Sequence, residues 1–173
     1  LRNGDIIAEL REEVQYGNYD VIIVGKSQKR NMSHDLLQYI NSSILVVNQY
    51  DNEKFKRVLL PIDNDGGSMK LAKYGIRVAL AYNIGIDLFT VSDKTPIDDE
   101  SKKVIKIKKL IRRSGVEYAH QKEQGDTVEK IIEKAGDDKI IVMRASGMSP
   151  IKRYFKGSIP LSIMNRCNVP ILI

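Results

Sequence analysis

The stretch from Ile140 to Ser158 constrains the fold most, because it joins two apolar segments through a loop that carries glycine and serine. The apolar residues at 140–143 predict a buried strand, and those after Ser158 predict a helix. The N-terminus of a helix presents unpaired backbone N–H groups and a partial positive charge, which an anion satisfies. Gly157 lets the backbone approach a phosphate without a Cβ in the way. The stretch therefore predicts a phosphate-binding loop between a strand and a helix.

Polar and basic side chains of this loop can add to phosphate binding. Ser158 can cap the following helix or donate its hydroxyl to a phosphate oxygen. Lys152, Arg153 and Lys156 lie in the loop itself. These three cations are either phosphate ligands or part of a solvated surface, and the sequence leaves both readings open.

The loop resembles the nucleotide loop of universal stress proteins, Gly-x2-Gly-x9-Gly followed by Ser or Thr. Gly147 matches the second glycine, and Gly157 and Ser158 match the end of the pattern. Arg144 stands where the first glycine is expected. The resemblance implies a domain that binds ATP, with or without Mg²⁺. Arg144 either closes such a site or turns its guanidinium outward to pair with phosphate.

Strand and helix patterns alternate along the rest of the chain, which predicts an α/β fold with a parallel sheet and right-handed crossovers. The predicted helices are 68–82, 101–115, 127–135 and one beginning at Ser158. The predicted strands are 56–62, 86–91, 116–121, 139–143 and 169–173. The resemblance implies a doubly wound, five-stranded sheet of the universal stress protein and adenine nucleotide alpha hydrolase-like type, with strand order 3-2-1-4-5.

That strand order places a topological switch between the first and fourth strands, where ligands bind at the carboxyl ends. Asp63 follows the first strand and Met143 ends the fourth. In the family these positions imply a ribose contact for Asp63 and an adenine sandwich for Val91 and Met143. The alternatives are a turn cap for Asp63 and a core role for the other two. The expected nucleotide-binding residues are Asp63, Val91, Met143, Arg144, Gly147, Lys156, Gly157 and Ser158.

Residues 1–50 repeat the pattern of the C-terminal half, with helix, strand, helix and strand at 6–14, 20–25, 33–40 and 43–48. Gly4-Asp5 matches Gly125-Asp126, and Ile22-Ile23-Val24 matches Ile141-Val142-Met143. The sequence therefore predicts that residues 1–50 are the C-terminal part of a first universal-stress-type repeat and that residues 51–173 are a complete domain. The first copy is shorter, and the difference falls in the phosphate loop. Four residues after Gly25 are too few to wrap a triphosphate, so we expect no nucleotide there.

Both copies end in an apolar strand, and exposed edge strands are usually covered. We therefore predict that strands 43–48 and 169–173 lie side by side or pair with a second chain. The family resemblance likewise implies self-association, as a dimer, through the last strand.

Charge and composition limit the class of protein. The net charge of +6 can attract phosphate or an anionic surface, and no nucleic-acid partner is expected. The basic helix at 101–115 is either a solvated outer face or a surface for an acidic partner or an anionic membrane. No apolar run reaches the roughly 18–20 residues of a membrane span. The single Cys167 offers no internal disulfide, so a cytoplasmic location is expected.

Three functions remain open. The first is an ATP-binding regulatory module of stress response, which Gly147, Gly157 and Ser158 favour. The second is an association module of the same fold without nucleotide, such as the cytoplasmic regulatory tail of a membrane transporter, which Arg144 favours. The third is an enzyme on a related fold, but the sequence lacks clustered carboxylates and a nucleophile elbow. His34 and His120 are each isolated in the sequence, so we predict no catalytic residue, no metal ligand and at most weak ATP hydrolysis.

Overall fold

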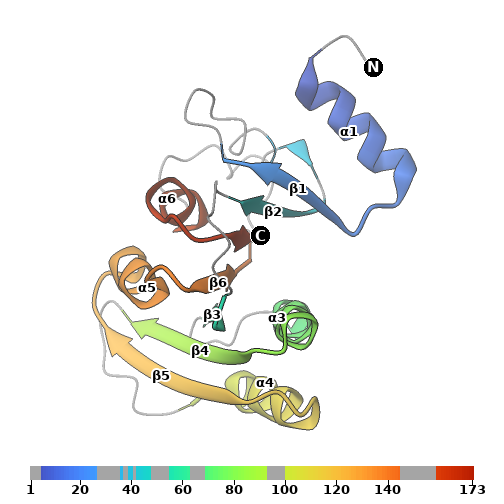
Figure 1. Cartoon of the computed structure of the whole chain (residues 1–173). Coiled ribbons are helices and arrows are strands. Elements are labelled where there is room, and N and C mark those ends of the chain that lie inside the picture. Colours follow the sequence, from blue (N-terminus) through green and yellow to red (C-terminus); the bar gives the residue numbers. More distant parts are fainter. Residues whose placement is uncertain are drawn as a thin grey trace.

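The computed structural model describes residues 5–26, 36, 39–40, 42–47, 55–62, 69–92, 100–144 and 159–173. These residues form a mixed seven-stranded sheet with helices on both faces (Figure 1). The helices are α1 (Ile6–Gly17), α3 (Met69–Tyr82), α4 (Lys102–Arg113), α5 (Thr127–Ala135) and α6 (Ile159–Arg166). Across the sheet, the strands are β1 (Val21–Gly25), β2 (Ser43–Val47), β7 (Ile171–Leu172), β6 (Lys139–Val142), β3 (Arg57–Ile62), β4 (Gly85–Ser92) and β5 (Tyr118–Gln124).

The order β5-β4-β3-β6-β7 is the predicted order 3-2-1-4-5, so the predicted strand order is confirmed. Each neighbouring pair within these five strands is parallel. Parallel strands need crossover connections, and α3, α4 and α5 provide them. The predicted helix at 33–40 lies mainly outside the described residues, although Leu36 and Tyr39 are helical.

Residues 6–47 extend this sheet by two strands. β1 pairs with β2 in parallel, and β2 pairs with β7 antiparallel, with Leu45 opposite Leu172. The Ile44 amide donates to the Ile173 carbonyl oxygen at 2.8 Å, and the Ile173 amide donates to the Ile44 carbonyl oxygen at 2.9 Å. The predicted pairing of the two terminal strands is thus confirmed within the chain. The sheet is consequently continuous and mixed, rather than five parallel strands beside a separate piece, because the pairing covers the free edge of β7.

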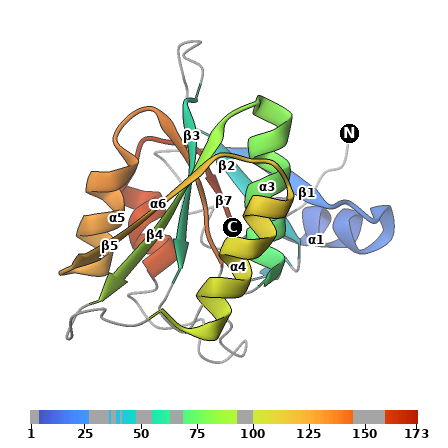
Figure 2. The same ribbon diagram turned by 90° about the horizontal axis from the view of Figure 1, so that it is seen from below.

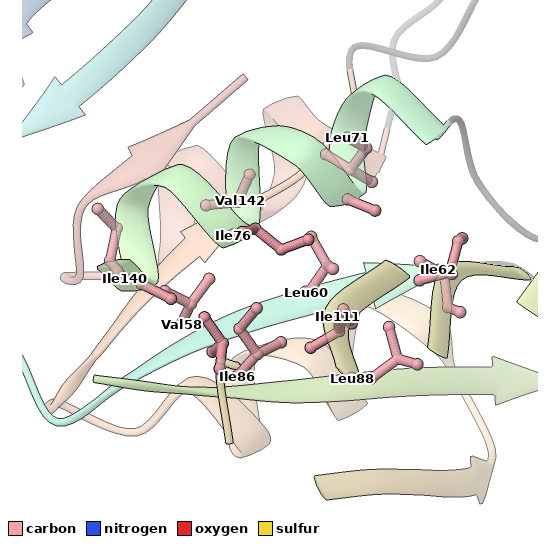
Figure 3. Packing of buried hydrophobic residues seen from close by; sticks show 14 of the residues in the cluster. Val58, Leu60, Ile62, Leu71, Ile76, Ile86, Leu88, Ile111, Ile140 and Val142 are labelled. Carbon is pink, nitrogen blue, oxygen red and sulfur yellow. The ribbon is translucent and has the colours of Figure 1, made fainter. Parts of the chain in front are cut away.

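The hydrophobic core has two layers, one on each face of the sheet. Helices α3 and α4 lie on one face, and α5 and α6 lie on the other (Figure 2). Side chains of β3 alternate between the layers: Val58 and Leu60 lie beneath α3, as Figure 3 shows, and Leu59 enters the opposite layer. All three are fully buried. Burial on both faces explains why β3 reads as a continuous apolar run.

The N-terminal and C-terminal parts share one type of helix cap, and a hydrogen bond from Lys26 connects them. Asp5 caps α1 by accepting from the Ile7 amide at 3.0 Å, and Asp126 caps α5 by accepting from the Glu129 amide at 2.9 Å. Lys26, directly after β1, donates to the carbonyl oxygen of Cys167 at 2.8 Å, just beyond α6. A cation is favourable at a helix C-terminus. Residues 6–26 are therefore tied to the rest of the chain by charge as well as by strand pairing.

This continuity predicts how a core substitution in the N-terminal part acts. Ile44→Ala removes a side chain with no exposed surface from β2, and we expect the free energy of unfolding to fall by about 2–5 kcal/mol. Urea denaturation followed by circular dichroism measures it. Ile23→Ala is the matched control, because Ile23 is 66% exposed, and it should change stability by less than about 0.5 kcal/mol. An unchanged main transition in Ile44→Ala would show that residues 6–47 unfold separately.

Candidate functional site

The carboxyl ends of β3 and β6 lie side by side at the centre of the sheet. The two strands are parallel, with Leu59 opposite Ile141. From β3 the chain proceeds outward through β4 and β5, then returns to β6 on the other side of β3. In open α/β sheets, such a reversal of strand order marks the crevice in which ligands bind, at the carboxyl ends of the strands. The crevice is where the sequence analysis expected a ligand.

The phosphate loop predicted from the sequence connects β6 to α6. The described residues stop at Arg144 and resume at Ile159, where α6 begins. The strand before the loop and the helix after it are therefore confirmed. The remaining predicted ligands lie outside the described residues: Asp63, Gly147, Lys152, Arg153, Lys156, Gly157 and Ser158.

Three predicted site residues are described, and their environments differ. Met143 is 6% exposed and belongs to the core layer beneath α5 and α6. Val91, near the end of β4, is half-buried and packs against the same layer. Arg144 is exposed. The core role weighed for Met143 is thus confirmed, and the structure brings Val91 and Met143 into one apolar layer on the two strands that flank β3.

Helix α6, which follows the loop, is fixed to its neighbour by an ion pair. Both guanidinium nitrogens of Arg166 donate to the carboxylate of Glu129 on α5, at 2.6 and 2.7 Å. A two-point contact of this kind restricts orientation more than a single bond does. Next to Arg166, the Cys167 side chain is buried, and burial raises the pKa of its thiol. Cys167 is therefore the small core residue that the sequence suggested.

A buried polar network between α4 and the sheet was not predicted from the sequence. His120 on β5 lies 3.0 Å from the Thr90 hydroxyl on β4 and 3.1 Å from a carboxylate oxygen of Glu100. Glu100 stands just before Ser101, which caps α4, and it also accepts from Lys108. Lys122 lies 3.8 Å from the same carboxylate. The view of His120 as isolated is therefore wrong, because strand pairing and the start of α4 bring together residues far apart in the chain.

The protonation state of His120 follows from its burial and from the charged groups beside it. Burial lowers its pKa, and the charge of Lys108 lowers it further. A hydrogen bond from Lys108 lowers the pKa of Glu100, which is therefore a carboxylate. A neutral imidazole then donates from Nδ1 to Glu100 and accepts from Thr90 at Nε2. The buried Thr90 hydroxyl and both ring nitrogens of His120 thus have hydrogen-bond partners, as buried polar groups require.

The order hydroxyl, imidazole, carboxylate also occurs in acyl-transfer enzymes, but exposure argues against that chemistry here. Thr90 is 1% exposed and the His120 side chain 7%, so no substrate atom can reach the hydroxyl. The network instead fastens the N-terminus of α4 to β4 and β5. In the sheet, His120 lies opposite Leu88, and Thr90 stands two residues beyond Leu88. This spacing is the only signal of the network in the sequence.

Two further properties of the described residues bear on function. They contain no group of three or more His, Cys, Asp or Glu side chains that could hold a metal ion. None of the helices in this part of the chain is both long and apolar enough to cross a membrane.

Comparison with known proteins connects the fold to one family. The model of the universal stress protein family matches residues 54–173. A universal stress protein of Methanocaldococcus jannaschii is 23% identical over 157 residues, covering 80% of this chain and 91% of the relative. The crystal structure of a universal stress protein from Archaeoglobus fulgidus superposes with a TM-score of 0.71 at 20% identity, over 98% of this chain and 64% of that one.

A third similar protein was solved with a ligand. This universal stress protein, in complex with cAMP, has a TM-score of 0.56 and 16% identity, over 69% of this chain and 95% of its own. At these identities the solved structures support the fold alone.

The His120 network predicts a loss of stability in acid. Because the folded-state pKa of His120 lies below its ordinary value of 6.5, the unfolded chain binds more protons below that pH. The contribution is therefore present above about pH 6.5 and is lost as the pH falls through the folded-state pKa. We expect the urea midpoint to drop between about pH 7.5 and 5.5, and to drop less in His120→Gln.

The other histidine supplies the control for this experiment. His34→Gln removes the same kind of titrating group but leaves His120 in place. The change in urea midpoint between these two pH values should then be the same in His34→Gln as in the unchanged protein. An equal pH dependence of the urea midpoint in His120→Gln and in the unchanged protein would show that His120 is not the source of the acid sensitivity.

Proposed function

The chain belongs to the universal stress protein family, and on that basis we propose that it is a regulatory module that binds an adenine nucleotide at the carboxyl ends of β3 and β6. One observation carries the proposal. The segment with Gly147, Gly157 and Ser158 joins β6 to α6 at the point where the strand order reverses. A glycine-bearing loop followed by a helix start is the arrangement that offers backbone N–H groups to phosphate.

The choice of an adenine nucleotide rests on two supports. A universal stress protein of the same fold has been solved in complex with cAMP, which makes an adenine ligand the natural first choice for this crevice. The second support is the apolar layer that Val91 and Met143 share, since apolar side chains favour an aromatic base. Met143 is almost fully buried, so only its edge is available to a base, and Val91 offers the larger contact.

The proposed ligand contacts divide by chemical group. The backbone N–H groups of Gly147, Gly157 and Ser158 hold the phosphates, and Lys156 or Lys152 adds positive charge. Asp63, which follows β3 directly, accepts from a ribose hydroxyl. We propose ATP as the ligand, with Mg²⁺ on its phosphates.

We also propose that residues 1–50 are the C-terminal part of a first repeat. Two features support this. The unit α1-β1-β2 has the same order and parallel pairing as α5-β6-β7, and α1 and α5 each begin at an aspartate cap. The chain spans 64% of the Archaeoglobus fulgidus structure, although that structure matches 98% of the chain. The junction of β2 and β7 is then an internal joint between repeats.

A second function, an association module without nucleotide, is favoured by one residue. Arg144 replaces the glycine at which the family pattern begins, and its side chain is exposed directly after β6. A side chain there can occupy the space that a phosphate needs. In that case the chain acts through contacts with other proteins alone.

Variants of the loop test nucleotide binding. Gly157→Val places a side chain where the phosphate oxygen belongs, so we expect isothermal titration to detect no ATP binding. Ser158→Ala removes one donor to a charged acceptor and should weaken binding roughly ten- to a hundredfold. Gly25→Ala is the control at the corresponding strand end of the N-terminal part, where an added Cβ meets nothing within 4 Å. It should leave the affinity unchanged.

Arg144→Gly decides between the two functions. If the guanidinium occupies the phosphate position, the glycine variant gains ATP affinity, because the family's first glycine is restored. If the guanidinium pairs with phosphate, the variant loses affinity. An absence of heat with both the unchanged protein and Arg144→Gly would reject nucleotide binding and leave the association module.

A further inference from the structure

Helices α3 and α4 concentrate positive charge on one face of the molecule. Their sequences contain three and seven Lys or Arg residues, respectively, and no Asp or Glu. Both helices pack on the same face of the sheet (Figure 2). On the opposite face, α1 and α5 together contain five glutamates and three Lys or Arg residues. The α3/α4 face therefore carries the larger positive charge.

The cations on the α3/α4 face are exposed and largely uncompensated. Lys108 pairs with Glu100. The other nine are exposed to solvent and make no ion pair in the part of the chain that the structure describes: Lys70, Lys73, Arg77, Lys102, Lys103, Lys106, Lys109, Arg112 and Arg113. Nine like charges on two packed helices repel one another. An anionic surface that covers these charges therefore lowers the electrostatic free energy of the two helices.

Apolar side chains on the same helices indicate which anionic surface fits. Leu80 and Tyr82 are each 57% exposed, and Met69 and Ile105 are each 40% exposed. Aliphatic side chains gain from contact with the acyl boundary of a bilayer, whereas a nucleic acid backbone offers them no apolar partner. Interspersed cations and large apolar side chains therefore favour lipid over nucleic acid.

Two aromatic rings on or beside this face, Tyr74 and Tyr118, already have cations over them, which also argues against single-stranded nucleic acid. Lys70 and Arg77 lie over the Tyr74 ring at 5.8 and 5.9 Å, and Arg112 lies over Tyr118 at 5.7 Å. Bases bind such proteins by stacking on free aromatic rings. The cation–π contacts instead hold three of the cations near fixed positions.

We propose that the outer face of α3 and α4 docks on the surface of an anionic phospholipid bilayer. The docking is peripheral, because Val104, Ile107 and Ile111, the apolar side of α4, are buried in the core. The exposed cations contact lipid headgroups, and Leu80 and Ile105 enter the headgroup region. Clusters of four to eight Lys or Arg on an amphipathic helix have this affinity for acidic lipids.

Vesicle co-sedimentation with the full chain tests the proposal. We expect binding to vesicles in which about one third of the lipid is phosphatidylglycerol, and none to pure phosphatidylcholine vesicles. Lys106→Gln with Lys109→Gln should weaken binding about 25-fold, since each cation removed near an anionic surface costs about fivefold. Leu80→Ser with Ile105→Ser should also weaken vesicle binding. All four positions are exposed, so folding is retained and is checked by circular dichroism.

The control removes two cations from the opposite side of the sheet. Arg11→Gln with Lys134→Gln, on α1 and α5, changes the net charge equally, and vesicle binding should stay unchanged. Equal losses in both double variants would mean attraction by net charge alone and would overturn the proposal. So would equal binding to neutral vesicles, no binding to anionic ones, or tighter binding to a DNA duplex that Leu80→Ser with Ile105→Ser leaves unaffected.

Discussion

The parallel pairing of β3 with both β4 and β6 is the constraint on which the rest of the structure depends. β3 contributes Val58 and Leu60 to one core layer and Leu59 to the other, with no exposed surface on any of them. A parallel strand buried on both faces must have helices on both sides. The same pairing forces the chain to leave β3 in one direction and return on the other side. The expected ligand position at the carboxyl ends of β3 and β6 is thus a consequence of how the core is built.

The junction of β2 with β7 is the second constraint, and it acts on the edge of the sheet. β7 has only two residues in the ladder, Ile171 and Leu172. Such a short strand has few backbone bonds of its own, so pairing on both sides contributes much of its order. Lys26 adds a contact from β1 to the end of α6. The helix that follows the proposed phosphate loop is therefore positioned partly by residues of the N-terminal segment.

The sequence predicted this fold well because its signals are local and repeated. Continuous apolar runs such as 58–60 mark strands buried on both faces, and the cap Asp126 marks the start of α5. The pairing of the terminal strands was predicted because exposed apolar edge strands are usually covered. The His120 network was missed because Thr90, Glu100 and His120 are separated by ten or more residues and meet only through strand register and the start of α4. For the site, the sequence identified the strands and the helix around the loop, but the direction of the Arg144 side chain depends on neighbours that no sequence pattern specifies.

The end of β4 belongs to both halves of the molecule. Neighbouring residues of a strand point to opposite faces, so Thr90 joins the network beneath α4 while Val91 packs into the layer proposed to receive adenine. Through Glu100 the same network fixes the start of α4, the helix with most of the exposed cations. The proposed nucleotide contact of Val91 therefore lies one residue from Thr90, whose network holds the start of α4 in place. Coupling between the two surfaces requires that this network have two arrangements, and a neutral His120 bonded on both sides stabilises only one of them. Protonation of His120 would remove its acceptor for Thr90, so the charge state of this histidine acts on the contact between β4 and the start of α4.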